Sequence, residues 1–339
     1  MLSLIISICF GLVIFYILFS LYRNIALKNK FIDKPESISM HKDGIPTGAG
    51  IVIVFSLVVF YLILKSNLFL EIKTSSYPNR DYLLIFSILI LGFINFYDDI
   101  KQIHPIYRLA AHFVLVMSSL PLFSFLGFEY YQYIPQKILI MLIIFLWIYL
   151  INIYNFLDGS NGYLTINSIP PFLIFSFVYF EKNLINFNSY LSLFMILILS
   201  VYLIFNFPKA KLFIGDSGSI IIGYLIGYLF FVLILDGYWN VALAMACYPI
   251  MDVSLTIIRK MKNGHYPWER LFDYFFLRAL TATNYNHQKI FYISLFYNLI
   301  NLFVIFMMIK FQTEILIIAT IVLSIMKIIL FNSLSKIRT

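Results

Sequence analysis

The stretch that decides the fold is FIGDSGSIIIGYLIGYLFFVLIL, residues 213–235. A long apolar run begins at Ser219, and Asp216 stands just before it among glycine and serine residues. A helix of about 20 apolar residues crosses the hydrocarbon core of a membrane. A carboxylate costs about 2.5–3.5 kcal/mol at the centre of such a helix and less near its end. The sequence therefore predicts Asp216 at the mouth of a membrane helix, with small neighbours that leave its oxygens accessible.

The composition is that of a membrane protein. Of 339 residues, 62% are hydrophobic and 12% are charged, whereas a soluble domain is about 45–50% apolar and about 25% charged. We predict an all-α polytopic protein with 10–11 transmembrane helices, in which residues 1–339 form a single integral membrane domain. The candidate spans lie near 1–22, 49–66, 81–97, 107–127, 136–156, 164–181, 187–207, 218–235, 238–258, 288–310 and 313–333. Cys9 and Cys247 both fall inside spans, so neither a disulfide nor a thiolate metal site is expected.

The distribution of basic residues gives the orientation of the spans. Most of the 24 Lys and Arg residues lie in loops on the side that faces residues 23–48. The positive-inside rule places that side in the cytoplasm. The N-terminus is then outside and the C-terminus cytoplasmic, with a first cytoplasmic loop at 23–48 and a large one at 259–289. Because the rule also explains the net charge of +8, we infer no nucleic-acid partner.

Acidic and amide residues gather where several spans end. They are Asp98 and Asp99 after the third span, Asn152, Asn155 and Asp158 after the fifth, and Asp216 before the eighth. In the orientation above, all of them reach the cytoplasmic face. A single acid at a helix end can simply meet water, but an Asp pair, an Asn/Asp/Gly cluster and a Gly-Asp-Ser-Gly turn together indicate a site. Asp252, inside the ninth span, is equally well explained as a polar partner between helices.

This array suits a divalent cation bound with phosphate. Neighbouring carboxylates repel each other unless a cation is present, and Mg²⁺ typically takes one or two carboxylates with phosphate and water oxygens. His104, His112 and His287 do not have the spacing of a zinc site. We therefore predict Mg²⁺ as the cofactor, with Mn²⁺ as the alternative, and Arg108 and Lys211 as cations for phosphate. A substrate at such a site can be part lipid and part nucleotide.

At these residues the sequence resembles the polyprenyl-phosphate N-acetylhexosamine-1-phosphate transferases, a glycosyltransferase 4 type family. These bacterial enzymes start O-antigen, common-antigen, teichoic acid and peptidoglycan lipid precursors. The resemblance runs from about residue 32 to residue 260 and begins with IDKPESISMHKDGIPTGAG, similar to the family's Asp-x-Pro…His…Pro…Gly-x-Gly segment. Asp98-Asp99, NIYNFLDGSNG and NFPKAKLFIGDSGS follow in the family's order. Four motifs in order make a specific signal.

The chain departs from the family pattern in two places. Asn161 stands where the family usually has a second Asp after Asp158. The loop 259–289 contains only His265 and His287, where the family usually has a histidine-rich motif. This favours the O-antigen and common-antigen branch, which lacks the His-His-His run of the peptidoglycan translocases. The aromatic and basic segment 268–280 is either an interfacial helix or a wall of the sugar pocket.

Carried over residue by residue, the resemblance implies a role for each matching position. Asp98 and Asp99 are the catalytic candidates that engage the polyprenyl phosphate, and Asp216 is the principal Mg²⁺ ligand, with Asp99 as the alternative second ligand. The substrate-binding candidates are Asn155 and Asp158 on the nucleotide side, Asn152 beside them, Arg108 and Lys211 for phosphate, and His41 in the first loop. Lys34 is a weaker candidate, since a positive-inside charge explains it better.

The resemblance implies transfer of a HexNAc-1-phosphate from a UDP-sugar to undecaprenyl phosphate in the bacterial inner membrane, with release of UMP. The second pKa of a phosphate monoester is about 6, so the lipid phosphate is mostly dianionic and a general base is not obligatory. Bringing two anions together requires a metal ion and cationic side chains. Direct attack is favoured, and a covalent intermediate on Asp98 stays as the alternative.

Two other classes compete with this hypothesis. A secondary transporter places charges near the bilayer midplane on repeated halves, whereas these acids lie at one face and no half-repeat is visible. A membrane scaffold does not explain the Asp/Gly turns. The sequence leaves open the glycan pathway, for which lipopolysaccharide O-antigen is our expectation, and also whether the chain forms a homodimer. It also leaves open the sugar, since UDP-GlcNAc, UDP-GalNAc and deoxy-amino sugars such as QuiNAc or FucNAc all fit.

Overall fold

The computed structural model describes residues 2–34, 43–66, 81–123, 135–182, 186–266 and 273–336. In these ranges the chain forms twelve α-helices, together with the 3-10 helices η1 (Leu120–Phe123) and η3 (Leu157–Gly159). The α-helices are α1 (Leu2–Lys28), α2 (Gly50–Lys65), α3 (Asp81–Ile100), α4 (Pro105–Ser119), α5 (Gln136–Phe156), α6 (Tyr163–Glu181), α7 (Phe187–Asn206), α8 (Asp216–Leu235), α9 (Trp239–Lys262), α10 (Phe275–Ala282), α11 (His287–Lys310) and α12 (Ile317–Lys336).

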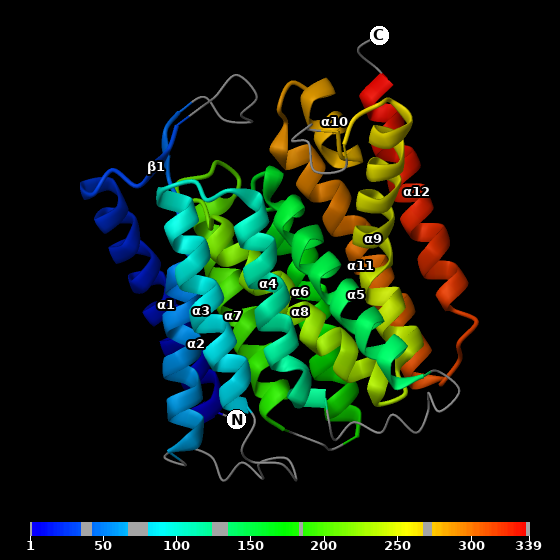
Figure 1. Cartoon of the computed structure of the whole chain (residues 1–339), viewed down its shortest axis with the longest axis horizontal. Coiled ribbons are helices and arrows are strands. Elements are labelled where there is room, and N and C mark those ends of the chain that lie inside the picture. Colours follow the sequence, from blue (N-terminus) through cyan, green and yellow to red (C-terminus); the bar gives the residue numbers. More distant parts are fainter. Residues whose placement is uncertain are drawn as a thin grey trace.

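The predicted fold class is confirmed. Ten of the described helices are long and apolar enough to cross a membrane, and α2 is a shorter apolar helix of 16 residues. Each of the eleven predicted spans coincides with one of these helices, with ends that differ by a few residues. The remaining helix, α10, lies within the predicted loop 259–289. Figure 1 shows the long helices side by side in one bundle, with the N-terminus at one end and the C-terminus at the other.

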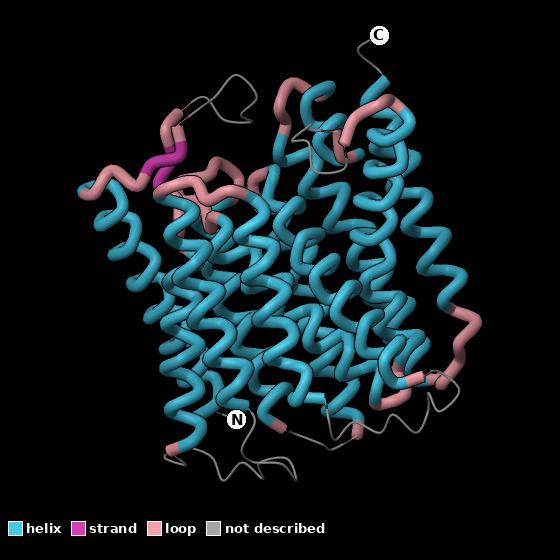
Figure 2. The backbone as a smooth tube through the Cα atoms, viewed as in Figure 1, coloured by secondary structure: helices cyan, strands magenta, loops and turns pink. Residues whose placement is uncertain are grey.

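A short β-hairpin belongs to the first predicted loop. Strands β1 (Ile32–Asp33) and β2 (Ile45–Pro46) pair antiparallel, with Ile32 opposite Pro46 and Asp33 opposite Ile45. Such a pair of two-residue strands carries no periodic signal, so the sequence did not predict it. The strands and α10 lie at the same end of the bundle as the C-terminus (Figures 1 and 2), which we call the C-terminal end.

Helix α8 is the centre of the bundle. Every residue from Ser217 to Leu233 is buried, and α2, α3, α5, α6 and α9 all contact this helix. Glycines allow the closest approach: a Cβ atom on Gly223 would lie 2.8 Å from Ile151 Cα in α5. The uniformly apolar run that follows Asp216 is thus surrounded by protein rather than by lipid, which agrees with the rule that a helix hydrophobic on all sides is buried.

The first loop is held beside the beginning of α8. The backbone N–H of Phe213 donates to the Pro46 carbonyl at 2.8 Å, and that of Gly50 donates to the Ile214 carbonyl at 2.8 Å. A Cβ atom on Gly50 would clash with the Gly218 backbone, so only a glycine allows α2 and α8 to begin this close together. This pairing places the end of the first loop next to Asp216.

Candidate active site

Asp99, at the end of α3, lies against the N-terminus of α8. Its carboxylate accepts hydrogen bonds from the backbone N–H groups of Asp216, at 2.7 Å, and Ser217, at 3.2 Å. The first N–H groups of an α-helix have no partner within the helix, and the positive end of the helix dipole attracts anions. Asp99 therefore caps α8 from another helix, and this capping fixes it against Asp216.

Gly215 makes this contact possible. It has φ 73° and ψ 177°, a backbone conformation that favours glycine. A Cβ atom at this position would lie 2.6 Å from the carboxyl carbon of Asp99. Any other residue would both strain the backbone and push the Asp99 carboxylate away from α8.

Arg108 joins the acids of α3 and α8. Its guanidinium is 2.6 Å from Asp98 Oδ2 and also forms an ion pair with Asp216 Oδ2. The other oxygen of Asp98 accepts the backbone N–H of Ile103 at 2.5 Å, which fixes the turn between α3 and α4. The side chains of Asp98, Arg108 and Asp216 are 9%, 15% and 27% exposed, so Asp216 is the member of this group most open to solvent.

Asn155 and Asp158 complete the group from α5 and η3. Asn155 Oδ1 accepts a hydrogen bond from Ser219 Oγ at 2.7 Å, which joins the end of α5 to the first turn of α8. The charges of Asp216, Asp99 and Asp33 all act on Asp158 across the site. Asp33, on β1, belongs to the quoted first-loop motif, yet the sequence analysis did not choose it. Direct contacts thus join α3, α4, α5 and α8 at the C-terminal end.

The turn after Asp158 is fixed by two residues that the sequence analysis did not choose. Asn206 Oδ1 accepts the backbone N–H of Gly162 at 2.6 Å, and His287 Nδ1 lies 2.9 Å from Ser160 Oγ and 3.3 Å from the backbone nitrogen of Asn161. Asn206 is the first residue of the NFPKAKLFIGDSGS motif, but nothing in the motif indicated that it would fix this turn. His287 stands outside every motif, and only the packing of α11 reveals it.

The other predicted residues lie farther from this group or outside the described residues. Asn152 donates to the Ile148 carbonyl of its own helix at 2.8 Å. Lys211 is exposed, and its backbone carbonyl accepts from Arg23 Nε at 3.3 Å. Lys34 is exposed after β1, and His41 lies outside the described residues. The structure therefore brings together Asp98, Asp99, Arg108, Asn155 and Asp216 through hydrogen bonds and ion pairs, with Asp158 three residues after Asn155 on η3, and leaves Asn152 and Lys211 at the margin.

The donor set fits a hard divalent cation. Within the described ranges, no three or more His, Cys, Asp or Glu side chains form a ready-made metal cage. Mg²⁺ needs no such cage, because it usually keeps several waters and binds through one or two carboxylates and substrate phosphates. Asp216 and the adjacent Asp99 offer oxygens of this kind at the C-terminal end of the bundle. The residues present therefore fit Mg²⁺, with Asp216 as the more accessible ligand.

Comparison with known families locates these residues within a recognised sequence pattern. Residues 82–234 match the model of glycosyl transferase family 4. The match runs from the first turn of α3 to the end of α8. It therefore contains Asp98, Asp99, Arg108, Asn155, Asp158 and Asp216, the six residues that the structure brings together.

Several curated relatives are similar over a larger part of the chain, and all three described here are named phospho-N-acetylmuramoyl-pentapeptide-transferase. The protein of Fervidobacterium nodosum is 27% identical over 227 residues, which cover 63% of this chain and 67% of the relative. That of Sulfurimonas denitrificans is 29% identical over 269 residues, covering 66% and 71%. That of Clostridium beijerinckii is 27% identical over 259 residues, covering 68% and 76%. The similarity supports a phosphosugar transferase, while their name describes a different donor from the HexNAc predicted above.

Proposed function

We propose that this chain transfers an N-acetylhexosamine-1-phosphate from a UDP-sugar to a polyprenyl phosphate and releases UMP. The observation that carries the proposal is that Arg108 pairs with both Asp98 and Asp216 while Asp99 accepts the backbone N–H of Asp216, inside the matched range. These groups lie at the end of a membrane bundle. A nucleotide sugar can reach this end from water, while the isoprenoid tail of the acceptor stays in the bilayer.

The reaction exchanges one phosphoanhydride bond for another. An oxygen of the lipid phosphate forms a bond to the β-phosphorus of the UDP-sugar, and the bond from that phosphorus to the bridging oxygen breaks. UMP leaves with the electron pair, and polyprenyl-diphosphate-sugar is the product. Because the lipid phosphate is mostly dianionic at neutral pH, no side chain has to remove a proton.

The side chains therefore have to position two anions and offset their charge. Asp216 and Asp99 are the residues that would hold Mg²⁺, which when bound neutralises phosphate charge. A guanidinium offers a planar set of donors suited to phosphate, so we assign Arg108 to the phosphate groups. Asn155, oriented by Ser219, and Asp158 are assigned to the nucleotide side of the site.

We also propose in which membrane, and on which side of it, the reaction takes place. The C-terminal end of the bundle would face the cytoplasm, where UDP-sugars are made, and the membrane would be the bacterial inner membrane. The reaction would then be the first membrane step in the synthesis of a cell-surface glycan, with O-antigen as our expected pathway. The distribution of Lys and Arg residues supports this orientation.

The test is a donor panel with purified protein, undecaprenyl phosphate and Mg²⁺. We expect UMP release from one or more UDP-HexNAc donors, and we expect it to require both the lipid phosphate and the metal ion. Asp43→Asn serves as a control, because Asp43 pairs at 3.4 Å with Lys209 and both side chains are largely exposed. Uptake of a solute by proteoliposomes without UMP release from any donor would instead favour a transporter.

A further inference from the structure

Helix α10 packs directly on the segment that carries Asp158. The Tyr274 ring stacks on Phe156 with centroids 5.3 Å apart, and the Phe276 ring stacks on Tyr163 at 4.0 Å. These two contacts lie before and after Asp158 in the sequence. Leu277 also closes over the backbone beside Asp158, because a Cβ atom on the adjacent glycine, residue 159, would lie 2.9 Å from Leu277 Cδ2. The rings of Tyr274 and Phe276 are thus used in packing, which leaves them no free face for a sugar.

Asp252 of α9 holds the first residue of α10. Its Oδ1 accepts the backbone N–H of Phe275 at 3.0 Å, and its Oδ2 accepts the hydroxyl of Tyr248 at 2.8 Å. The Asp252 side chain is fully buried. A charge-assisted bond to a free N–H at a helix start is stronger than an ordinary hydrogen bond. This acid therefore fixes where α10 begins.

Lys327 of α12 reaches this acid through the ring of Tyr248. It is 1% exposed, and its Nζ lies 3.6 Å from the centroid of the Tyr248 ring. The same Nζ is 3.3 Å from Asn167 Oδ1 and 3.4 Å from Asn298 Oδ1. The Tyr248 hydroxyl donates to Asp252, so Tyr248 links the two ionisable side chains. An ionisable side chain inside a membrane bundle is expensive, so a paired one indicates a role.

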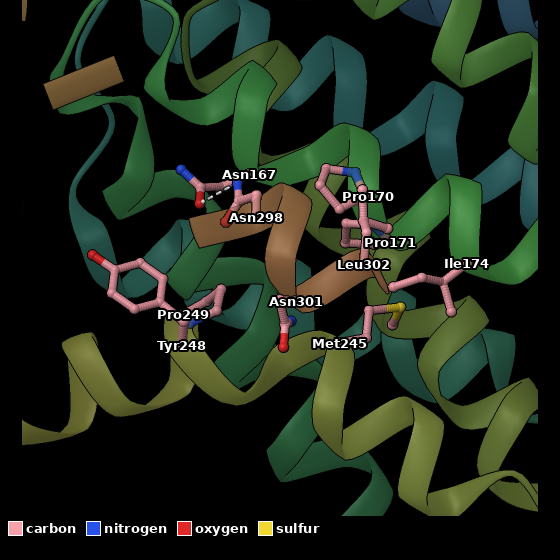
Figure 3. A pocket seen from close by; sticks show the side chains of 10 residues that line it. All are labelled: Asn167, Pro170, Pro171, Ile174, Met245, Tyr248, Pro249, Asn298, Asn301 and Leu302. Atoms are coloured by element: carbon pink, nitrogen blue, oxygen red, sulfur yellow. Dashed lines mark hydrogen bonds between the residues drawn. The ribbon is translucent and has the colours of Figure 1, made fainter. Parts of the chain in front are cut away.

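The surrounding groups make one connected network. Tyr163 and Tyr248 join through their hydroxyls at 2.6 Å, and Asn298 Nδ2 is 3.2 Å from Asn167 Oδ1. Figure 3 shows Asn167, Asn298 and Tyr248 around one small cavity between α6, α9 and α11. We call these residues, with Asp252 and Lys327, the buried network. At one end it continues through Asp252 to the backbone of α10.

We propose that Asp252 and Lys327 are positioning residues that seat α10 against the Asp158 segment and so shape the donor side of the site. The seating itself is a property of the fold. Its effect on the donor rests on the function proposed above. Asp252 holds α10 through the backbone N–H of Phe275. A substitution at Phe275 can therefore remove this hydrogen bond while Asp252 and Lys327 both stay.

Phe275→Pro is the sharpest variant. Proline lacks the N–H that Asp252 accepts, and it is well tolerated as the first residue of a helix. The preceding Tyr274 has φ −61° and ψ 146°, the extended conformation that a residue before proline prefers. Phe275→Ala is the matched control, because it removes the ring that lies over Arg259 but keeps the N–H. Comparison of the two isolates the bond to Asp252.

The first readout is amide hydrogen exchange of residues 276–282, which needs no substrate. We expect Phe275→Pro to speed exchange roughly 10-fold relative to Phe275→Ala, as for the loss of one bond to a charged group. Asp252→Leu should do the same, and Asp252→Asn, which keeps an oxygen acceptor, should do so less. Ser254→Ala, which removes only the 2.7 Å bond to Tyr149 two residues along α9, should leave α10 unchanged. Equal exchange in Phe275→Pro and Phe275→Ala would overturn the seating.

The second readout is steady-state kinetics of UMP release. We expect Phe275→Pro to raise the KM for the UDP-sugar several-fold above that of Phe275→Ala, with the KM for lipid phosphate unchanged. Lys327→Met should raise the same KM. Faster α10 exchange with an unchanged donor KM would overturn the effect on the donor. If the wild-type protein releases no UMP from any donor, the proposed function fails, and the exchange experiment still decides the seating.

Discussion

The acidic site at the C-terminal end and the buried network around Lys327 both combine carboxylates with basic side chains in the same bundle. In the site, one guanidinium, that of Arg108, contacts the carboxylates of both Asp98 and Asp216, while Asp99 lies against the N-terminus of α8. In the network, Lys327 and Asp252 both contact Tyr248, and the charge of Arg259 also acts on Asp252. Asp216 is 27% exposed, whereas Asp252 is fully buried.

This difference in exposure and charge suits the two regions to different tasks, one to binding a ligand and the other to holding helices in place. Carboxylates that outnumber the cation beside them, and that keep contact with water, attract a further cation when one is available. Asp252 is fully buried, and its two oxygens already accept hydrogen bonds from Phe275 and Tyr248, so a further ion gains little there. The first arrangement is suited to a ligand that comes and goes. The second is suited to holding helices in fixed positions.

The largest expected effect is loss of turnover in Asp216→Asn. This change removes one charge and one good oxygen ligand from the site. We expect the rate of UMP release to fall roughly 10³-fold, the upper range for removal of one electrostatic group from an active site. The protein should remain folded, as judged by thermal unfolding in detergent. A near-normal rate at limiting Mg²⁺ would remove Asp216 from the metal site.

Lys327→Met tests how much the buried network contributes to the stability of the fold. The substitution preserves much of the side-chain volume but removes the buried amine that contacts Tyr248, Asn167 and Asn298. We expect the free energy of unfolding to fall by about 1–3 kcal/mol, the cost of leaving buried polar groups without a partner. If Arg108→Met destabilises as much as Lys327→Met, the distinction between the two regions is wrong.

Gly215→Ala tests whether activity depends on the position of the Asp99 carboxylate. The new methyl group would meet the carboxylate of Asp99, and we expect activity to fall roughly 10- to 100-fold, because small displacements of reacting groups have effects of this size. Gly264→Ala is the matched control: its φ is 79°, but a Cβ atom there would meet nothing within 4 Å. It shares the backbone strain without a contact, so its activity should be normal. Equal losses in both variants would mean that backbone strain alone is responsible.

The smallest effect concerns the backbone hydrogen bond that Pro170 removes from the interior of α6. Pro170 has no N–H for the Ile166 carbonyl one turn earlier, and Asn298 Nδ2 donates to that carbonyl at 2.8 Å instead. We expect Asn298→Ala to lower the free energy of unfolding by about 0.6 kcal/mol, the average for such bonds between membrane helices. In a Pro170→Ala background the loss should shrink, since the helix then satisfies Ile166 itself. The same loss in both backgrounds would show that Asn298 acts through Asn167 or Lys327.

Much of the site could be predicted because motif residues stand at the ends of spans. Asp98, Asp99 and Asp216 were chosen on that ground, and they lie in contact. The resemblance also selected Arg108, although the structure pairs it with two acids rather than leaving it open to solvent. His287 and Asn206 were not chosen, because their partners are backbone and side-chain groups of a turn far away in the sequence. Such partners leave no local pattern.

The sequence by itself determined the number and position of the membrane helices and the end of the bundle at which the acids gather. These features depend on the length of each apolar run, a local property that each segment carries alone. Only the tertiary structure decided that Asp99 caps α8, that Arg108 reaches an acid 108 residues away, and that Asp252 holds the start of α10. Those contacts depend on which helices pack together and how closely. Glycines such as Gly50 and Gly215 allow the close approach, because a Cβ atom at either position would clash with a residue far away in the sequence. The sequence around each glycine does not show which residue that is.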